Sequence, residues 1–125
     1  MAGRYKVAAK EDRTADGIVF DSRKEMIDYV NIFRPLINSG ITVKLQVRFP
    51  LWAHPGVHYD DMNLSVRQYH DGAPVKVAEW IADFVVVEKT GPPRIYDSKG
   101  HRTAIYKLKK KFFEACYPKL RIVEI

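Results

Sequence analysis

The segment VKVAEWIADFVVVEKTGPPRIYDSK occupies residues 75–99 and carries the clearest structural signal in the chain. Two runs of apolar and β-branched residues, at 75–87 and 94–99, are separated by a connection at 88–93 that contains one Gly and two Pro. Val, Ile and aromatic residues favour strands, whereas Gly and Pro favour turns. The segment therefore predicts a β-hairpin.

A further strand is predicted upstream of this hairpin, at residues 41–49. Apolar and polar residues alternate there with the two-residue period of a half-buried strand, and the apolar set is Val43, Leu45, Val47 and Phe49. The following residues, 50–61, are rich in Pro, Gly, His and Asp and predict a loop. A short strand at 64–69 and a turn at Asp71-Gly72 complete this part of the chain.

A helix is predicted to begin at Ser22, because Ser22-Arg23-Lys24-Glu25 is a capping-box sequence. The residues that follow have the spacing of an amphipathic helix, in the set Met26, Tyr29, Val30 and Phe33. Pro35 disfavours helical geometry at the residue before it, so we expect the helix to kink or end at Arg34. Residues 38–40 close the segment.

A second helix is predicted to begin after Thr103, a suitable N-cap residue, and to end before Pro118. Its expected apolar stripe consists of Ile105, Leu108, Phe112 and Ala115, opposite a polar face of Lys107, Lys110, Lys111 and Glu114. Residues 120–124 form the last strand. The order helix, three strands, helix, strand (αβββαβ) predicts an α/β fold in which helices flank a mixed β-sheet. The second helix is the crossover to the final strand.

Length and composition indicate one folded domain. A chain of 125 residues with 46% hydrophobic residues is long enough for one core and too short for two. Residues 1–17 are charged, contain two glycines and have little periodicity, so we expect a flexible basic arm that ends in a turn at Asp16-Gly17. Residues 18–125 form the single domain.

The chain lacks the sequence features of membrane and secreted proteins. No apolar run approaches the roughly 20 residues that cross a bilayer, and the first residues lack the apolar core of a secretory signal. We therefore expect a cytoplasmic protein with no membrane contact.

Cysteine and histidine residues give no support for a zinc site. The only cysteine, Cys116, has no internal disulfide partner and is expected to pack as a small core residue. The histidines that lie near acidic residues match no structural zinc spacing, so we expect a surface loop around His54, His58 and His70 with Asp60, Asp61 and Asp71.

Positive charge is concentrated at the C-terminal end of the chain. The formal net charge is +6, and residues 101–125 contain seven Lys or Arg against two Glu. This distribution suits a polyanionic partner such as DNA. Because the second helix closely follows the 94–99 strand, we expect its first turn and basic side chains to contact DNA phosphates, through His101, Arg102, Thr103, Lys107, Lys109, Lys110 and Lys111. The alternative is a solvated face without a ligand.

Two acidic residues interrupt the predicted hairpin. Asp83 lies within an apolar run, where an unsatisfied carboxylate costs several kcal/mol. Asp97 and Lys99 are two residues apart on the next strand and therefore point to the same face, and the hairpin can set Asp97 beside Asp83. Paired carboxylates repel each other unless they share a proton or a cation, and carboxylate oxygens plus water suit Mg²⁺.

These residues predict a hydrolytic site with Mg²⁺, for which Mn²⁺ substitutes. Asp83, Asp97 and the backbone carbonyl of Ser98 are the expected metal ligands. Lys99 would stabilise the developing charge of a phosphoryl transition state, or orient and deprotonate the attacking water. The alternative for Asp83 is a buried salt bridge, for example with Lys99.

The ordered set of acids and lysine resembles the PD-(D/E)xK nuclease superfamily. The matching residues are Glu25 in the first helix, Asp83, and the triplet Asp97-Ser98-Lys99. Two residues depart from the pattern, since Ala82 stands where the superfamily name has proline and Asp97 stands where glutamate is commoner.

The similarity extends from about residue 20 to the C-terminus. Segments 20–25, 82–84 and 97–100 are similar to the landmark segments of a family of small phage-encoded nucleases related to Holliday-junction resolvases. The resemblance implies a restriction-endonuclease-like core and a metal-dependent endonuclease that hydrolyses phosphodiester bonds in DNA. Glu25 would then be catalytic as well, as a ligand for a second ion or a water.

The resemblance also implies the substrate and the assembly. Branched DNA such as a Holliday junction is the expected substrate, during phage replication, recombination or packaging in the bacterial host cytoplasm. Two symmetric cuts require two active sites, so a homodimer is expected.

Two other functions and one structural role stay open. A non-catalytic nucleic-acid-binding module that keeps the nuclease fold is the alternative function. A basic structural or assembly protein is a third, which explains the charge but not Asp83. Glu25 also fits the N3 position of the capping box, a role that needs no metal.

Overall fold

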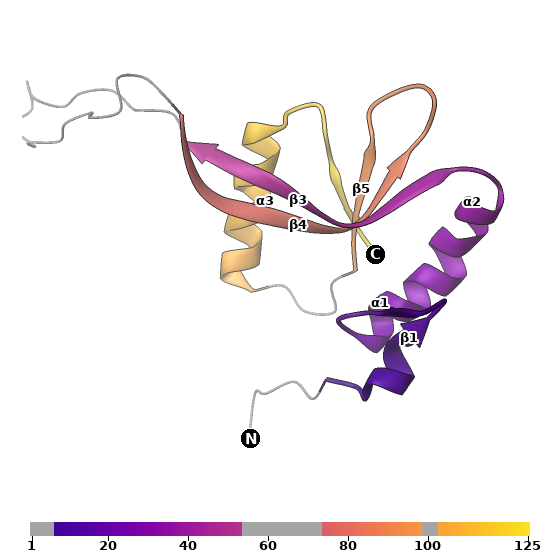
Figure 1. Ribbon diagram of the computed structural model, residues 1–125. Helices are drawn as coiled ribbons and strands as arrows, with labels where there is room; N and C mark the ends of the chain where they lie inside the picture. Colours follow the sequence, from indigo (N-terminus) through magenta and orange to yellow (C-terminus); the bar gives the residue numbers. More distant parts are fainter. Residues whose placement is uncertain (1–6, 54–73, 99–102) are drawn as a thin grey trace, which may run out of the picture.

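The computed structural model describes residues 7–53, 74–98 and 103–125 (Figure 1). Its helices are η1 (Lys10–Arg13, 3₁₀), α1 (Arg23–Asp28), η2 (Tyr29–Phe33, π), α2 (Arg34–Asn38) and α3 (Ala104–Cys116). Its strands are β1 (Thr14–Ala15), β2 (Ile18–Val19), β3 (Thr42–Ala53), β4 (Val75–Val87), β5 (Arg94–Asp97) and β6 (Ile122–Glu124). The expected strand at 64–69, the turn at 71–72 and the histidine group lie outside the described residues.

The main sheet has four strands in the order β3-β4-β5-β6. β4 pairs antiparallel with both β3 and β5, whereas β5 pairs parallel with β6. The predicted hairpin is thus confirmed as β4 and β5, and α3 is the crossover that makes the final pair parallel. The fold is α/β with a mixed sheet, as the order of elements predicted.

β3 is longer than predicted. Residues 50–53 were expected to begin a loop, but they continue β3 and pair with β4 as far as Ala53 opposite Val75. Pro50 is tolerated because β3 is an edge strand, where half of the backbone groups have no partner strand in the sheet. The loop prediction is therefore wrong for these four residues.

The first helix begins as predicted, becomes irregular just before Arg34, and closes at residues 38–40 as predicted. Ser22 is the N-cap, and its Oγ accepts a hydrogen bond from the backbone N–H of Glu25 at 3.0 Å. The helical path continues through the π-helical segment η2 and α2 to Asn38, and Gly40 follows with φ +94°. The helical path continues past Pro35 because a π-helical turn precedes it, in which the Arg34 N–H donates to the Tyr29 carbonyl.

Part of the predicted N-terminal arm is folded. η1 and β1 lie within residues 1–17, and β1 pairs with β2 around the predicted turn at Asp16-Gly17. Asp16 accepts hydrogen bonds from the Tyr29 hydroxyl at 2.8 Å and from Arg34 at 3.1 Å. These contacts fasten the β1–β2 hairpin to the helices. Residues 1–6 lie outside the described part of the chain.

Two apolar clusters form the core, one on the α1–α2 side of the sheet and one on the α3 side. The first contains Phe20, Tyr29, Phe33, Phe84 and Val86. The second contains Leu51, Trp80, Ala82, Val85, Ile95, Phe113 and Ile122. In Figure 1, α3 lies beside one end of the β3–β4 pair, and α1 and α2 lie beyond the other end.

β3 changes the face that it presents to these clusters at Gln46. Its odd-numbered residues contact the α1–α2 cluster at Val43 and Leu45, but the α3 cluster at Val47 and Phe49. In a regular strand all of these side chains would point to one face. Gln46 has φ +52°, a left-handed conformation that inverts the alternation at this residue.

β4 inverts at the matching position. The register pairs Leu45 with Phe84 and Val47 with Ala82, so Gln46 lies opposite Asp83. Phe84 contacts the α1–α2 cluster, whereas Ala82 contacts the α3 cluster. The strand pair therefore passes from one core to the other at Gln46 and Asp83.

α3 begins at the predicted N-cap but buries a different face. Thr103 Oγ1 accepts a hydrogen bond from the Tyr106 N–H at 3.0 Å. Ile105 and Leu108, which were predicted to be buried, are 72% and 66% exposed. Ala115 is exposed as well, and only Phe112 of the predicted stripe packs against the α3-side cluster, together with the aromatic residues Tyr106, Phe113 and Tyr117.

The reason for this difference is the size of the rings. Phe113 packs against Phe49 with ring centroids 5.2 Å apart and against Trp80 at 5.9 Å. Aromatic side chains remove more apolar area from water than Ile or Leu, so they determine the orientation of the helix. Cys116 is half-buried at the edge of this face, where its thiol bonds to the Trp52 carbonyl at 3.3 Å. No helix in the described ranges is long and apolar enough to cross a membrane.

We predict that Phe84→Ala lowers the free energy of unfolding by about 3–5 kcal/mol, because Phe84 is completely buried and stacks on Phe33 with centroids 4.0 Å apart. Ile81→Ala is the matched control, since Ile81 is exposed on the same strand and should cost less than about 1 kcal/mol. Urea denaturation of both variants measures the difference. Equal losses would show that the α1–α2 cluster does not hold β4.

Candidate active site

Three acidic residues are buried on three neighbouring elements. Glu25 on α1 is 4% exposed, Asp83 on β4 is 7% exposed and Asp97 at the end of β5 is 0% exposed. Buried carboxylates destabilise a fold unless hydrogen bonds, cations or protons compensate for the lost hydration. The hydrogen-bond and ionic partners of these carboxylates therefore indicate which ligands the site can bind.

Gln46 joins Glu25 to Asp83. Its amide nitrogen Nε2 donates to Glu25 Oε1 at 2.8 Å and to Asp83 Oδ1 at 3.3 Å. The residue is exposed, so the pair of carboxylates meets solvent at the Gln46 side chain. Sequence reasoning missed Gln46, because it looked like any other polar residue in an alternating strand.

The end of β5 approaches Asp83 from the other side. The last paired residues of the hairpin are Phe84 and Tyr96, and one step further the register sets Asp97 opposite Asp83. Asp83 Oδ2 accepts a hydrogen bond from the backbone N–H of Ser98 at 2.8 Å. Asp83 is thereby held at the junction of β3, β4 and β5.

The Asp97 side chain lies on the α3 side of this junction. It interacts with the hydroxyl of Tyr106, whose pKa is raised by burial and, after burial, by the carboxylates of Asp97 and Glu124. From the described residues, no hydrogen bond of ordinary geometry reaches either Asp97 carboxylate oxygen. Asp97 therefore has buried oxygen atoms with the capacity to bind a further group.

A second network fastens α1 to the ends of β5 and β6. Lys24 Nζ lies 2.8 Å from Asp28 Oδ2, 3.1 Å from Ser98 Oγ and 2.6 Å from the Ile125 carbonyl oxygen. The Ser98 hydroxyl also donates to Asp28. This network holds the helix that carries Glu25 against the strand that carries Asp97, and sequence reasoning did not identify it.

A small cavity of about 50 Å³ lies beside Glu25 and Gln46. Its other lining residues are Ile18, Val19, Phe20, Asp21 and Leu45. A water molecule takes roughly 30 Å³ in the liquid, so the cavity has room for one. Glu25 is thus placed where a carboxylate can orient a water.

The donor set has the chemistry of a divalent-cation site but not a complete arrangement of ligands. Glu25, Asp83 and Asp97 offer only hard oxygen atoms, which suit Mg²⁺. Within the part of the chain that the structure describes, no group of three or more His, Cys, Asp or Glu side chains is arranged to hold a metal ion. The residues therefore fit Mg²⁺ by donor type and burial, with Asp97 turned toward Tyr106.

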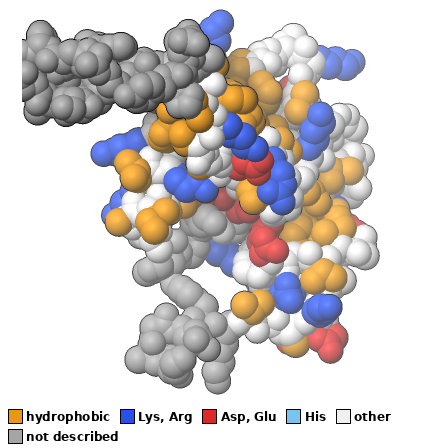
Figure 2. Space-filling model, turned by 60° about the vertical axis from the view of Figure 1, so that its left-hand side comes forward, with side chains coloured by type: hydrophobic (Ala, Val, Ile, Leu, Met, Phe, Trp, Pro, Cys, Tyr) orange, Lys and Arg blue, Asp and Glu red, His pale blue; other side chains and the backbone are white. Residues whose placement is uncertain are grey.

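The predicted DNA-contacting residues fall into three groups. His101 and Arg102 lie outside the described residues, as does Lys99, the predicted catalytic lysine. Thr103 caps α3, Lys107 and Lys111 are exposed on α3, and Lys109 is half-buried. Lys110 is half-buried and forms an ion pair with Glu124 at 3.0 Å, so its charge is already matched. In the face drawn in Figure 2, Lys and Arg side chains are interspersed with apolar side chains.

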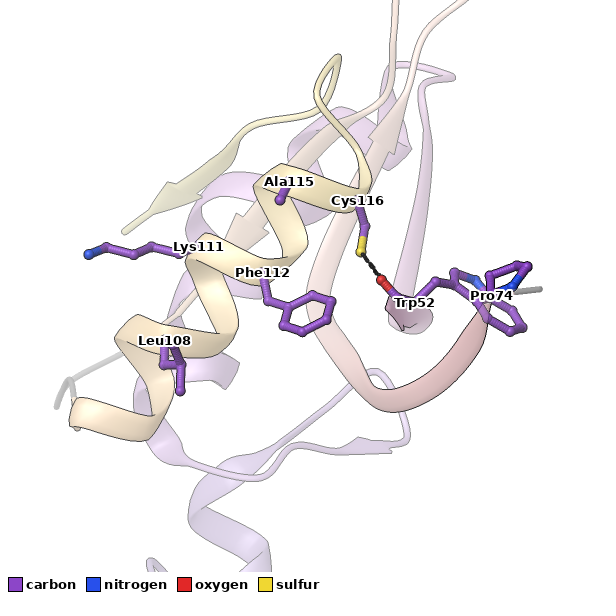
Figure 3. A pocket seen from close by; sticks show the side chains of 7 residues that line it. All are labelled: Trp52, Pro74, Leu108, Lys111, Phe112, Ala115 and Cys116. Carbon is purple, nitrogen blue, oxygen red and sulfur yellow. Dashed lines mark hydrogen bonds between the residues drawn. The ribbon is translucent and has the colours of Figure 1, made fainter. Parts of the chain in front are cut away.

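An apolar groove lies between α3 and the paired ends of β3 and β4, and none of the three buried acids lines it. It has a volume of about 750 Å³ and is lined by Trp52, Pro74, Leu108, Lys111, Phe112, Ala115 and Cys116. Figure 3 shows Lys111 extending away from the aromatic rings of Phe112 and Trp52. Among the described residues, the lining offers no carboxylate or imidazole.

Comparison with known proteins identifies a family and no individual relative. A family model described as "Protein of unknown function (DUF1064)" matches residues 4–125. Searches of curated proteins and of solved structures gave no match.

The backbone at Gln46 allows a direct test of the inversion. Gln46→Gly and Gln46→Ala remove the same side-chain hydrogen bonds, but only glycine adopts φ +52° without steric cost. We predict that the glycine variant is more stable to urea than the alanine variant by about 1 kcal/mol, although glycine normally weakens a strand. A more stable alanine variant would mean that residue 46 does not adopt the left-handed conformation.

Proposed function

Because the chain belongs to the DUF1064 family, whose description names no activity, we propose its function from the site itself. The protein is a Mg²⁺-dependent endonuclease that hydrolyses phosphodiester bonds in DNA. The observation that carries the proposal is that Glu25 and Asp83, both buried, share the Gln46 amide at the point where the strand pair inverts, with the buried Asp97 opposite Asp83 in the register.

A purely structural explanation of three buried acids is unfavourable. Buried ion pairs rarely stabilise a protein more than apolar packing does, so such acids are usually retained for another reason. The hydrogen-bond donors to Glu25 and Asp83 described above are the Gln46 amide and the Ser98 N–H, which carry no charge. They orient the carboxylates and add no charge of their own.

The fold supports the same proposal. After the β1–β2 hairpin, the elements follow the order αβββαβ, with α3 crossing over to the parallel strand β6. This order and the mixed sheet fit the restriction-endonuclease-like core that the sequence resemblance implied. We therefore propose that the chain is a member of the PD-(D/E)xK superfamily.

Each residue of the site has a proposed role. Asp83, Asp97 and the backbone carbonyl of Ser98 would hold Mg²⁺, which when bound polarises the phosphate and lowers the pKa of water. Glu25 would orient a water or a second ion in the small cavity beside it. Lys99 follows Ser98 directly and would stabilise negative charge on the phosphoryl oxygens.

DNA binding is assigned mainly to the exposed lysines of α3. Lys107 and Lys111 are exposed, whereas the ion pair with Glu124 makes Lys110 a weaker candidate than the sequence suggested. The proposed substrate is branched DNA of the Holliday-junction type, cut by a homodimer during phage growth in the host cytoplasm. The substrate, the homodimer and the phage setting all rest on the sequence resemblance.

A non-catalytic DNA-binding module is the second candidate. It is favoured by the absence of a ready three-ligand metal arrangement among the described residues. It is also favoured by the interaction of Asp97 with Tyr106. The two functions differ in one property, since only the nuclease converts DNA to product.

Asp83→Asn tests the proposed catalytic function. With a labelled four-way junction and Mg²⁺, we predict that the variant loses cleavage by on the order of 100-fold or more, because one metal ligand loses its charge. Junction binding in Ca²⁺ should survive or tighten, because the repulsion between site and phosphate falls.

Glu88→Gln is the matched control for this experiment, since Glu88 is an exposed acid that pairs with Arg94 in the β4–β5 connection. It should cleave like the unmodified protein. Product formed equally well in EDTA, or by Asp83→Asn, would contradict the metal assignment. Junction binding without any cleavage would instead support the non-catalytic module.

A second prediction concerns the basic face of α3. Replacing both Lys107 and Lys111 with Gln should weaken binding to every DNA and reduce the slope of log affinity against log salt by up to about 2, because each phosphate contact contributes about 0.9. The control is Lys89→Gln, an exposed lysine in the β4–β5 connection. An unchanged slope in the double variant would show that the α3 lysines are only solvated.

A further inference from the structure

We infer that Gln46 is a positioning residue of this site, which holds the Glu25 carboxylate against Asp83 so that the pair is ready for a cation. The inference rests on the proposed function and adds a residue that the sequence resemblance did not include. Gln46 would touch neither the metal nor the DNA phosphate, and would act through the two carboxylates.

The contacts of Gln46 support this role. A single nitrogen atom donates to carboxylates from two different elements, α1 and β4. An amide can do this with its two N–H groups, whereas a hydroxyl has one. Glu25 and Asp83 are thereby linked at a distance that their mutual repulsion would otherwise oppose.

The backbone of Gln46 is unfavourable for a residue without a special role. A left-handed conformation costs an L-residue roughly 1–2 kcal/mol, and glycine would satisfy the same turn of the strand without that cost. The Gln46 side chain is exposed and belongs to neither apolar cluster, so core packing does not require it. Strained residues of this kind occur preferentially at functional sites.

The neutrality of the amide matters for cation binding. A lysine at position 46 would also donate to both carboxylates, but its charge would compete with a cation. A glutamate would add a third negative charge and would have no proton to donate at neutral pH. Glutamine orients the acids and adds no charge of its own.

Gln46 also explains where the Glu25 side chain points. A glutamate at the third position of a capping box normally reaches back toward the backbone of the cap residue. Here the Ser22 half of the box is present, and the Glu25 carboxylate contacts the Gln46 amide on β3. The amide therefore draws Glu25 toward the strand carboxylates.

Calorimetric titration with Mn²⁺, without DNA, tests the inference independently of cleavage. Gln46→Met keeps the length of the side chain and removes both donors, and we expect it to weaken Mn²⁺ binding by about 10-fold, the lower end of the usual loss when a partner of a metal ligand is removed. Lys44→Met, on an exposed residue of the same strand, should bind Mn²⁺ like the unmodified protein.

A combination with Glu25→Gln separates positioning from a general structural effect. If Gln46 acts by holding Glu25, the loss of Mn²⁺ affinity in the double variant is smaller than the product of the two single losses. Independent multiplication of the losses, or Mn²⁺ affinity unchanged in Gln46→Met, would overturn the inference while the proposed function stands. No Mn²⁺ binding and no cleavage by the unmodified protein would overturn both.

Gln46→Glu provides a readout that does not require metal binding to be measured directly. The new carboxylate keeps the shape but replaces two hydrogen bonds with repulsion, so the melting temperature in EDTA should fall by several degrees, and Mn²⁺ should raise it more than it raises that of the unmodified protein. An unchanged melting temperature in EDTA would contradict close contact between position 46 and the two acids.

Discussion

The left-handed backbone of Gln46 opposite Asp83 is the constraint on which the rest of this structure depends. One pair of strands, β3 and β4, serves two separate apolar clusters, and it can do so only if both strands invert at a common position. The two residues that lie opposite each other at that position, Gln46 and Asp83, are polar and belong to neither apolar cluster. The candidate site lies where the two halves of the core meet.

The electrostatics of this point favour a ligand over a purely structural role. Glu25 and Asp83 share the amide of Gln46, and the backbone of Ser98 supports Asp83 from β5. The Lys24 network uses its positive charge on Asp28 and holds α1 against the end of β5. Hard carboxylate oxygen atoms held by rigid neighbours are groups that a hydrated divalent cation can use.

The sequence predicted what depends on local signals. Hairpin β4–β5, the caps at Ser22 and Thr103 and the αβββαβ order follow from turn residues, capping residues and alternation. The buried face of α3 did not follow, because the hydropathy pattern treats Ile105 and Leu108 as equal to Phe113, whereas packing against Phe49 and Trp80 favours the larger ring.

Part of the candidate site could also be predicted from local sequence signals. The pairing register carries Asp83 toward Asp97, and that register follows from the hairpin alone. Gln46 gave no signal, since a left-handed glutamine within an alternating strand looks like any other polar residue. Its contact with Glu25 is tertiary, between residues 21 apart in the chain, and no local pattern reports it.

Anomalous diffraction from a crystal soaked in Mn²⁺ tests most directly whether Asp83 and Asp97 together bind a divalent cation. We predict an anomalous peak bonded to carboxylate oxygens of both residues, with the Asp97 side chain turned from Tyr106 toward Asp83. A Mn²⁺-soaked crystal with no ion between these two residues, and with Asp97 still against Tyr106, would contradict it.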